Sequence, residues 1–227
     1  PDLLTLRAAA VLRTVPVLAA PCRADGAESL AGRIAAEAVA PPPGQERLLL
    51  TFPMTRDAAV RRAARQAAAG AVADRLARGL SVAFVTEGDP TFYSSFLDLL
   101  AEAPRRFPEA AVEIVPGVTS LTAVAAAARL PLADGDDRLA VLPAARALDD
   151  LPRLAASFEA LVLVKAAGVL PALAERLDAA GLAGRAVLVS DASTGRERVH
   201  FDLAAAAAQS PGYFSTVLVR CGAEEQP

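Results

Sequence analysis

A short loop at residues 86–90 contains the residues best suited to holding a small ligand. It follows an apolar run that predicts a buried strand, and it includes Gly88, Asp89 and Pro90. Glycine lets a ligand approach the backbone closely. Asp89 is expected to accept hydrogen bonds from the first amides of a helix that opens at once, with Pro90 at its first position. Open α/β sheets bind ligands in such loops, although a plain helix cap is the more common explanation of this motif.

A second loop repeats this arrangement further along the chain. The apolar run at 111–115 predicts a strand, residues 116–118 form a Pro-Gly turn, and Thr119 or Ser120 is expected to cap the next helix. Pro-Gly is also an ordinary turn. Because both loops follow strands near one proposed domain junction, we expect them to face a common cleft. Backbone amides and small hydroxyls would suit the ribose, purine and amino-acid parts of an adenosyl ligand.

Residues that are rare in the chain exclude several chemistries. His200 is the only histidine, in an alternating segment typical of an exposed strand, so a Ser-His-Asp or Cys-His site is disfavoured. Cys22 and Cys221 have no CxxC partner, which excludes a disulfide framework and favours the cytoplasm. The sequence has no HExxH motif and no Cys/His cluster, and therefore predicts no metal site. It also lacks a P-loop and a GxGxxG motif, which argues against an ATPase or a dinucleotide-dependent oxidoreductase.

Composition and charge indicate a folded globular protein. The 227 residues are 54% hydrophobic and 22% charged, which argues against disorder. The net charge of −3 and an aromatic content of 4% disfavour nucleic-acid binding. No apolar run reaches the length of about 18 residues that a membrane span needs. Lys165 is the only lysine among 23 basic residues and lies at the end of an apolar run, where it is either required or present by chance.

Strand-like and helix-like segments alternate, which predicts an α/β protein with two α/β domains. We place an N-terminal domain with a parallel sheet at 1–115 and a C-terminal domain with a mixed sheet at 116–227. The expected strands are 15–20, 46–52, 80–86, 111–115, 138–142, 160–165, 185–190, 196–201 and 213–220. The expected helices are 3–13, 27–39, 56–78, 91–103, 119–129, 148–156, 168–180 and 203–208.

Taken together, the motifs of the chain are similar to those of a known family. They are Pro1–Arg7, Pro21 with Gly26 and Ser29, Phe52–Met54, Glu87–Tyr93, Pro116–Ser120, the strand ending at Lys165, and Tyr213–Ser215. In this order and spacing, over essentially the whole chain, they resemble the tetrapyrrole (corrin/porphyrin) methyltransferases. The family opens with a strand and a Gly-x-Gly-Pro-Gly loop that would precede Pro1 and lie outside this sequence. Val164 also stands where methionine is usual, a tolerable apolar exchange.

The resemblance implies a fold and a cofactor site. Two α/β domains of a homodimer subunit would hold S-adenosylmethionine in the cleft between them and release S-adenosylhomocysteine. Carried over by position, the cofactor-binding residues are Gly88, Asp89, Phe92, Thr119, Ser120, Val164, Ala192, Ser215 and Thr216.

The resemblance also implies a reaction. Several motifs are most similar to the members that methylate carbon 20 of precorrin-2 or its cobalt counterpart in cobalamin biosynthesis. The alternative is a sibling that acts at another ring position, such as a uroporphyrinogen-III methyltransferase, and a binding module without activity is a further hypothesis. Methyl transfer requires alignment and exclusion of water rather than a metal. Because the substrate carries many carboxylates, basic residues are expected to bind it, and the candidates are Arg23, Arg33, Arg56 and Lys165.

Overall fold

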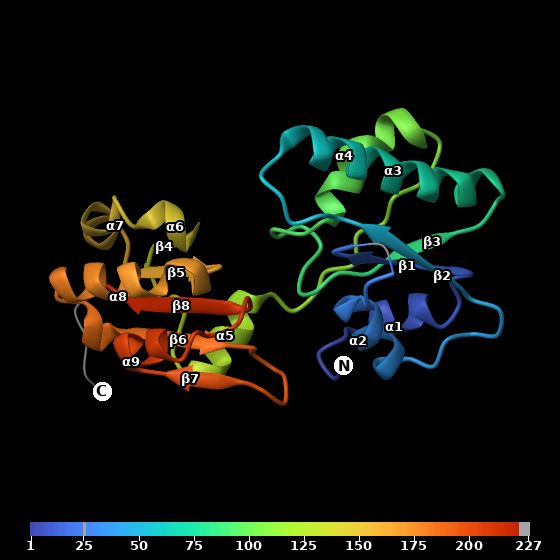
Figure 1. Cartoon of the computed structure of the whole chain (residues 1–227). Coiled ribbons are helices and arrows are strands. Elements are labelled where there is room, and N and C mark those ends of the chain that lie inside the picture. The colour runs from blue at the N-terminus through green and yellow to red at the C-terminus, as the bar shows by residue number, and fades with distance from the viewer. Residues whose placement is uncertain (25, 223–227) are drawn as a thin grey trace. The chain divides into compact units, whose positions relative to one another are not determined.

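The computed structural model describes residues 1–24 and 26–222, and Figure 1 traces their course. The chain forms two compact units, Pro1–Thr119 and a second unit that begins at Ser120. The sequence analysis placed the boundary after residue 115 instead. In the described residues, no helix is both long and apolar enough to cross a membrane.

The first unit contains a three-stranded parallel sheet with the order β2-β1-β3. Its central strand is β1 (Val17–Cys22), flanked by β2 (Glu46–Thr51) and β3 (Val82–Phe84). Because the strands are parallel, all three end at the same edge of the sheet. The loops after β1, β2 and β3, which contain most of the predicted ligand-binding residues of this unit, therefore begin at that edge.

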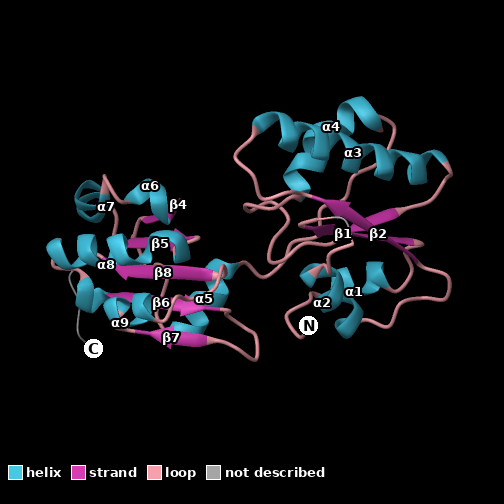
Figure 2. Cartoon of the chain, in the orientation of Figure 1, coloured by secondary structure: helices cyan, strands magenta, loops and turns pink. Residues whose placement is uncertain are grey.

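Helices cover both faces of this sheet, as Figures 1 and 2 show. One face packs against α1 and α2, through Leu18, Leu12 and Ala35, and the other against α3 and α4, through Val17, Val72 and Leu99. The bounds of these helices are α1 (Leu6–Leu12), α2 (Leu30–Ala38), α3 (Ala58–Ala77) and α4 (Phe96–Arg106). Leu18 and Val17 point to opposite faces because side chains alternate along a strand.

The second unit contains a five-stranded mixed sheet with the order β4-β5-β8-β6-β7. The strands are β4 (Leu139–Pro143), β5 (Ala160–Val164), β6 (Ala186–Ser190), β7 (Arg198–His200) and β8 (Ser215–Arg220). β4 runs parallel to β5, whereas β8 runs antiparallel to both β5 and β6. Consequently β4, β5 and β6 all end at the edge of the sheet where β8 begins.

The core of this unit follows the alternation of side chains along its strands. On one face, Leu161 and Leu163 of β5 belong to a core completed by four helices, whereas Val162 and Val164 pack against α5 on the other face. Figure 1 shows this division of the helices. They are α5 (Ser120–Ala128), α6 (Ala144–Ala147), α7 (Leu151–Ser157), α8 (Leu170–Ala179) and α9 (Leu203–Ala208), with short 3₁₀ turns at Ala167–Val169 and Ala183–Arg185.

Polar side chains at several helix starts explain where those helices begin. Thr5, Ser29, Asp57 and Asp202 each accept a hydrogen bond from an amide in the first turn of the helix that follows. The first amides of a helix have no partner within the helix, so each cap satisfies one or two of them. These caps account for the starts of α1, α2, α3 and α9.

One predicted strand is wrong, and the helix predicted at 148–156 has different bounds. Residues 111–115 form no strand, because the segment runs along the surface, where Val112 and Ile114 are exposed and Glu113 forms an ion pair with Arg7 of α1. Its alternating apolar pattern resembles that of a strand, but it has no neighbouring strand in the ladders of the described residues. The helix predicted at 148–156 is present as α7, which begins at Leu151 after a turn at residues 148–150, and the short helix α6 before that turn was not predicted.

An ion pair connects the starts of β4 and β5. The carboxylate of Glu159 accepts hydrogen bonds from the backbone amide of Arg138 at 2.7 Å and from its Nη2 at 2.8 Å. Hydrogen bonds from this guanidinium, followed by the one from the backbone amide, lower the pKa of Glu159 to about 2 from the ordinary 4.5.

We predict that Glu159→Gln removes part of the acid sensitivity of unfolding. Because the folded pKa is depressed, the ionised carboxylate stabilises the fold above pH 4.5, and this contribution is lost as the pH falls toward 2. Urea midpoints measured between neutral and acidic pH should therefore fall less steeply for Glu159→Gln than for the wild type, and the variant should be the less stable protein at pH 7. Equal pH dependence in both proteins would contradict this account.

Candidate cofactor site

The side chain of Asp89 joins the two loops that the sequence analysis singled out. Its Oδ2 accepts a hydrogen bond from the backbone amide of Gly117 at 2.9 Å. Its Oδ1 accepts hydrogen bonds from the amide of Thr91 at 2.8 Å and from the Thr91 hydroxyl at 2.5 Å. One carboxylate thus fixes the loop after β3 and attaches it to the segment that leads to α5.

Glycines allow these loops to come into direct backbone contact. Gly88 has a φ of +72°, which a residue with a Cβ rarely adopts. A Cβ atom placed on Gly117 would lie 2.3 Å from the carbonyl oxygen of Gly88 and 3.4 Å from the Cα of Asp89. The two loops can therefore come this close only because Gly117 has no side chain. Sequence reasoning took this Pro-Gly pair for an ordinary turn and did not count Gly117 among the site residues.

The prediction that Asp89 caps a helix is wrong. The helix α4 begins at Phe96, not at residue 91, and the segment between Pro90 and Ser95 is a series of turns. The hydroxyl of Ser94 accepts a hydrogen bond from the Phe96 amide at 3.0 Å and lies 3.0 Å from the hydroxyl of Thr86. Asp89 is therefore left to bind Gly117, so its loss should disturb the loops rather than α4.

The hydrogen bonds to Asp89 keep it ionised. The hydroxyl of Thr91 and then the amide of Gly117 lower the pKa of Asp89 below the ordinary 3.8, against an opposing effect of burial. Because a lowered pKa means that the folded protein favours the carboxylate, the junction between the loops is maintained at neutral pH and weakens only in acid. Three groups donate hydrogen bonds to the carboxylate of Asp89, which is a half-buried residue.

The other predicted cofactor residues around this junction are arranged as follows. Phe92 is half-buried, and its ring packs edge-to-face against Tyr93 with centroids 4.6 Å apart. Thr119 is half-buried at the end of the first unit. Ser120 is the exposed first residue of α5 and belongs to the second unit. Gly88, Asp89 and Gly117 are thus brought together, with Phe92 and Thr119 a few residues away along the two loops.

In the second unit, the predicted cofactor residues gather at one edge of the sheet. Val164, at the end of β5, pairs with Thr216, and Ser190, at the end of β6, pairs with Ser215. Ala192 lies two positions beyond Ser190. Val164, Ser215 and Thr216 are buried and Ala192 is half-buried, so these four side chains contribute little accessible surface.

Residues in left-handed conformations follow both strands that flank β8. Lys165 has a φ of +58°, and the next amide, that of Ala166, donates to the carbonyl of Ser215 at 2.9 Å. Asp191 has a φ of +48°, and its amide donates to the carbonyl of Phe214 at 2.9 Å. Non-glycine residues in this region cost about 1–3 kcal/mol and are frequent at ligand sites. Sequence reasoning missed Asp191, since its backbone conformation has no sequence signal.

The four predicted basic residues occupy different environments. Arg23 follows β1, Arg56 lies beyond β2, and both side chains are exposed. They therefore belong to loops that begin at the same edge of the sheet as the Gly88 loop. Arg33 lies on α2, where Glu28 and Glu37 are within ion-pair distance at 3.5 and 3.8 Å. Lys165 is exposed at the carboxyl edge of the second sheet. Arg33 therefore belongs to a surface ion-pair network.

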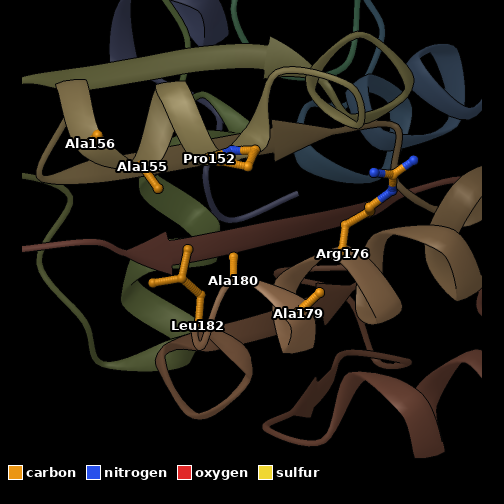
Figure 3. Close-up of a pocket in the computed structure, with 7 residues that line it drawn as sticks. All are labelled: Pro152, Ala155, Ala156, Arg176, Ala179, Ala180 and Leu182. Atoms are coloured by element: carbon orange, nitrogen blue, oxygen red, sulfur yellow. The ribbon is translucent and has the colours of Figure 1, made fainter.

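A hollow elsewhere in the second unit contains none of these residues. It has a volume of about 430 Å³ and lies between α7 and α8, lined by Pro152, Ala155, Ala156, Arg176, Ala179, Ala180 and Leu182 (Figure 3). Of the described residues that line it, only Arg176 is charged. Among the described residues, no group of three or more His, Cys, Asp or Glu side chains could hold a metal ion. The expectation that no metal is used stays a prediction.

Comparison with known proteins decides the family. A family model described as tetrapyrrole (corrin/porphyrin) methylases matches residues 1–208. The chain belongs to the tetrapyrrole methylases. A precorrin-2 C(20)-methyltransferase from Sinorhizobium sp is 37% identical, with 96% of this chain and 90% of the relative covered. A cobalt-precorrin-2 C(20)-methyltransferase from Salmonella typhimurium is 34% identical, with 96% and 91% covered.

Solved structures show the same fold. A cobalt precorrin-4 methyltransferase has a TM-score of 0.70 at 23% identity, with 97% of this chain and 90% of the other covered. A uroporphyrin-III C-methyltransferase from Thermus thermophilus, complexed with S-adenosylhomocysteine, has a TM-score of 0.64 at 24% identity, with 97% and 93% covered. The predicted α/β fold class and the predicted enzyme class, a tetrapyrrole methylase that uses S-adenosylmethionine, are confirmed.

We predict that Gly117→Ala weakens binding of S-adenosylhomocysteine by about tenfold or more. The new Cβ would lie 2.3 Å from the Gly88 carbonyl oxygen, so one loop must move, and displacements of about 1 Å at binding groups can cost up to 10²-fold. Isothermal titration measures the affinity.

Gly70→Ala is the matched control for this substitution. Gly70 lies within α3, and no atom lies within 4 Å of the position that its Cβ would take, so alanine should stabilise the helix by about 0.5–1 kcal/mol and leave the affinity unchanged. An unchanged affinity in Gly117→Ala would show that the contact between the two loops does not shape the cofactor site.

Proposed function

We propose that this tetrapyrrole methylase transfers a methyl group from S-adenosylmethionine to carbon 20 of precorrin-2, or of its cobalt-containing counterpart, in cobalamin biosynthesis. The similarity to two C(20)-methyltransferases over 96% of the chain supports this substrate position. The observation that carries the proposed cofactor site is the junction of two loops through Asp89 and Gly117. A uroporphyrinogen-III methyltransferase remains the alternative, because a sibling of that activity shares the fold.

The residues at the two sheet edges fit the proposed cofactor. Gly88 is exposed and has no side chain, so its backbone is open to a ligand, and Gly117 holds that backbone in place. Thr119 supplies a hydroxyl in the first unit, and the loop after Ser190 supplies backbone groups and Ala192 in the second. The cofactor supplies an electrophilic methyl group on a positively charged sulfur. We propose that these residues bind the cofactor through noncovalent contacts only.

The contribution of the protein to catalysis is then mainly positional. The nucleophilic carbon of the substrate must lie in line with the bond from sulfur to methyl, and fixed loops lower the entropic cost of that alignment. Three hydrogen bonds fix the Asp89 loop, and two backbone hydrogen bonds fix the start of β8. We propose that Arg23, Arg56 and Lys165 bind substrate carboxylates, and that Arg33 does so only by exchanging its ion pairs with Glu28 and Glu37.

We further propose that the enzyme is a homodimer located in the cytoplasm, and that its place is in tetrapyrrole metabolism without a metal cofactor. The resemblance to the family supports the dimer. The two cysteines, Cys22 and Cys221, are both free, which fits a reducing compartment.

The proposed reaction predicts a defined product. Incubation with precorrin-2 and S-adenosylmethionine carrying a ¹³C-labelled methyl group should give S-adenosylhomocysteine, a released proton and a tetrapyrrole with the label on the meso carbon at position 20. NMR of the product identifies the labelled carbon. Label at any other ring position, or methylation of uroporphyrinogen III with none of precorrin-2, would replace the proposal by its sibling alternative.

We predict that Lys165→Gln raises the KM for the tetrapyrrole about tenfold or more and leaves the affinity for S-adenosylhomocysteine unchanged. A hydrogen bond to a charged group contributes about 1.5–3 kcal/mol, and the exposed side chain of Lys165 is proposed to bind the substrate only. Arg176→Gln removes a positive charge from the exposed surface of α8 and should change neither constant. Parallel changes in Lys165→Gln and Arg176→Gln would indicate a general effect of net charge instead.

A further inference from the structure

Tyr93 has a backbone conformation that is unfavourable for its residue type. Its φ is +50°, in the left-handed region, where a bulky side chain is an outlier and glycine would be unstrained. It is one of only two tyrosines in the chain. Strained residues of this kind persist where the surrounding structure holds them, and they concentrate at ligand sites. The conformation therefore requires an explanation beyond the turn itself.

The segment around Tyr93 is fixed on both sides. Before it, Asp89 is bound to Gly117 at 2.9 Å, and after it the hydroxyls of Ser94 and Thr86 lie 3.0 Å apart. Phe92 packs against the ring of Tyr93 with an interplanar angle of 72°. These contacts hold the tyrosine ring in one position, yet Tyr93 remains 48% exposed. The fold thus maintains an aromatic surface that it does not use for its own core.

Other exposed apolar residues belong to the loops at the same edge of the sheet. Met54 follows β2 and is 62% exposed, and Val118 follows Gly117 and is 37% exposed. We call Met54, Tyr93 and Val118 the apolar rim. The strand directions and the contact of Gly117 with Gly88 bring the loops that carry these three residues to one end of the sheet. The loops that carry Arg23 and Arg56 begin at the same edge of the sheet. This edge therefore has apolar side chains together with positive charge.

A tetrapyrrole has the complementary chemistry. Its macrocycle is large and largely apolar, whereas its carboxylates are attached at the periphery. A tyrosine suits such a ligand, because its ring presents a rigid apolar face next to a polar hydroxyl. Adenosine is a less suitable partner for an apolar rim, because polar atoms are distributed over both its ribose and its purine.

We propose that Tyr93 is a specificity-determining residue that contacts the macrocycle of the substrate and does not bind the cofactor. The inference rests on the proposed function, in that it takes the substrate to be a polycarboxylate tetrapyrrole. The left-handed backbone of Tyr93 positions the ring for this contact, and the apolar rim extends it.

Replacement of Tyr93 by glycine tests the proposal, because glycine relieves the backbone strain while it removes the ring. Tyr93→Gly should melt at a temperature no lower than the wild type and bind S-adenosylhomocysteine with unchanged affinity. Its kcat/KM for precorrin-2 should fall at least tenfold, mainly through KM. Tyr93→Asn, which also tolerates a positive φ, should behave in the same way, and Tyr93→Phe should retain most of the activity.

A binding measurement separates this test from turnover. Uroporphyrin III, a fluorescent tetrapyrrole with peripheral carboxylates, serves as a probe that does not react. Tyr93→Gly should bind it at least tenfold more weakly, by the same factor at low and at high salt, because an apolar contact is not screened. Arg23→Gln should weaken binding more at low salt than at high salt. Phe201→Ala removes a 66% exposed aromatic ring that follows β7 at the opposite edge of the second sheet, and should change nothing.

The outcomes distinguish the proposal from its alternatives. An active wild type together with a Tyr93→Gly variant of unchanged KM and probe affinity overturns the role of Tyr93. A parallel loss of S-adenosylhomocysteine affinity would make Tyr93 a cofactor contact, and a lower melting temperature in both Tyr93→Gly and Tyr93→Asn would make it structural. A wild-type protein that binds S-adenosylhomocysteine but methylates no precorrin-2 would instead overturn the proposed function.

Discussion

The hydrogen bond from the Gly117 amide to Asp89 is the constraint on which the first unit's site depends. It connects the loop that follows β3 to a segment that, within the described part of the chain, has no strand of its own. The same segment also carries the ion pair between Glu113 and Arg7, but both side chains are exposed, and exposed ion pairs contribute little. The contact of Gly117 with the Gly88 carbonyl adds a steric restriction to the electrostatic one. Together they determine where the exposed backbone of Gly88 lies.

The candidate residues of the second unit are also fixed in position, but not by a contact between two loops. Its candidate residues are held by the sheet itself, because β8 begins between the ends of β5 and β6. The amide of Ala166, two residues after β5, donates to the Ser215 carbonyl, and the amide of Asp191, directly after β6, donates to the carbonyl of Phe214, just before β8. Lys165 is an extra residue between the pair Val164–Thr216 and the bond from Ala166 to Ser215, which is the pattern of a β-bulge. The extra residue bends the chain after β5, and Lys165 adopts a positive φ so that Ala166 can still hydrogen-bond to Ser215.

Much of the architecture was accessible from the sequence, because burial on both faces of a sheet leaves continuous apolar runs such as those of β1 and β5. The failures have physical causes. At 111–115, the alternation of apolar and polar residues matched a strand, but pairing depends on a neighbour that no local pattern specifies. At Asp89, the Asp-Pro pair matched a helix cap, but the carboxylate bonds to Gly117, 28 positions away. The importance of Gly117, Asp191 and Tyr93 lies in backbone geometry, which residue type alone does not reveal.

The position of β8 in the middle of its sheet has a consequence for the order of folding. β5 and β6 do not pair with each other, and both hydrogen-bond to β8, which comes after them in the chain. Until β8 has been synthesised, a nascent chain can form only the pairs β4–β5 and β6–β7, each with unsatisfied strand edges. Formation of the five-stranded sheet must therefore wait for the last strand, and the open edges in the meantime are surfaces that a chaperone would recognise.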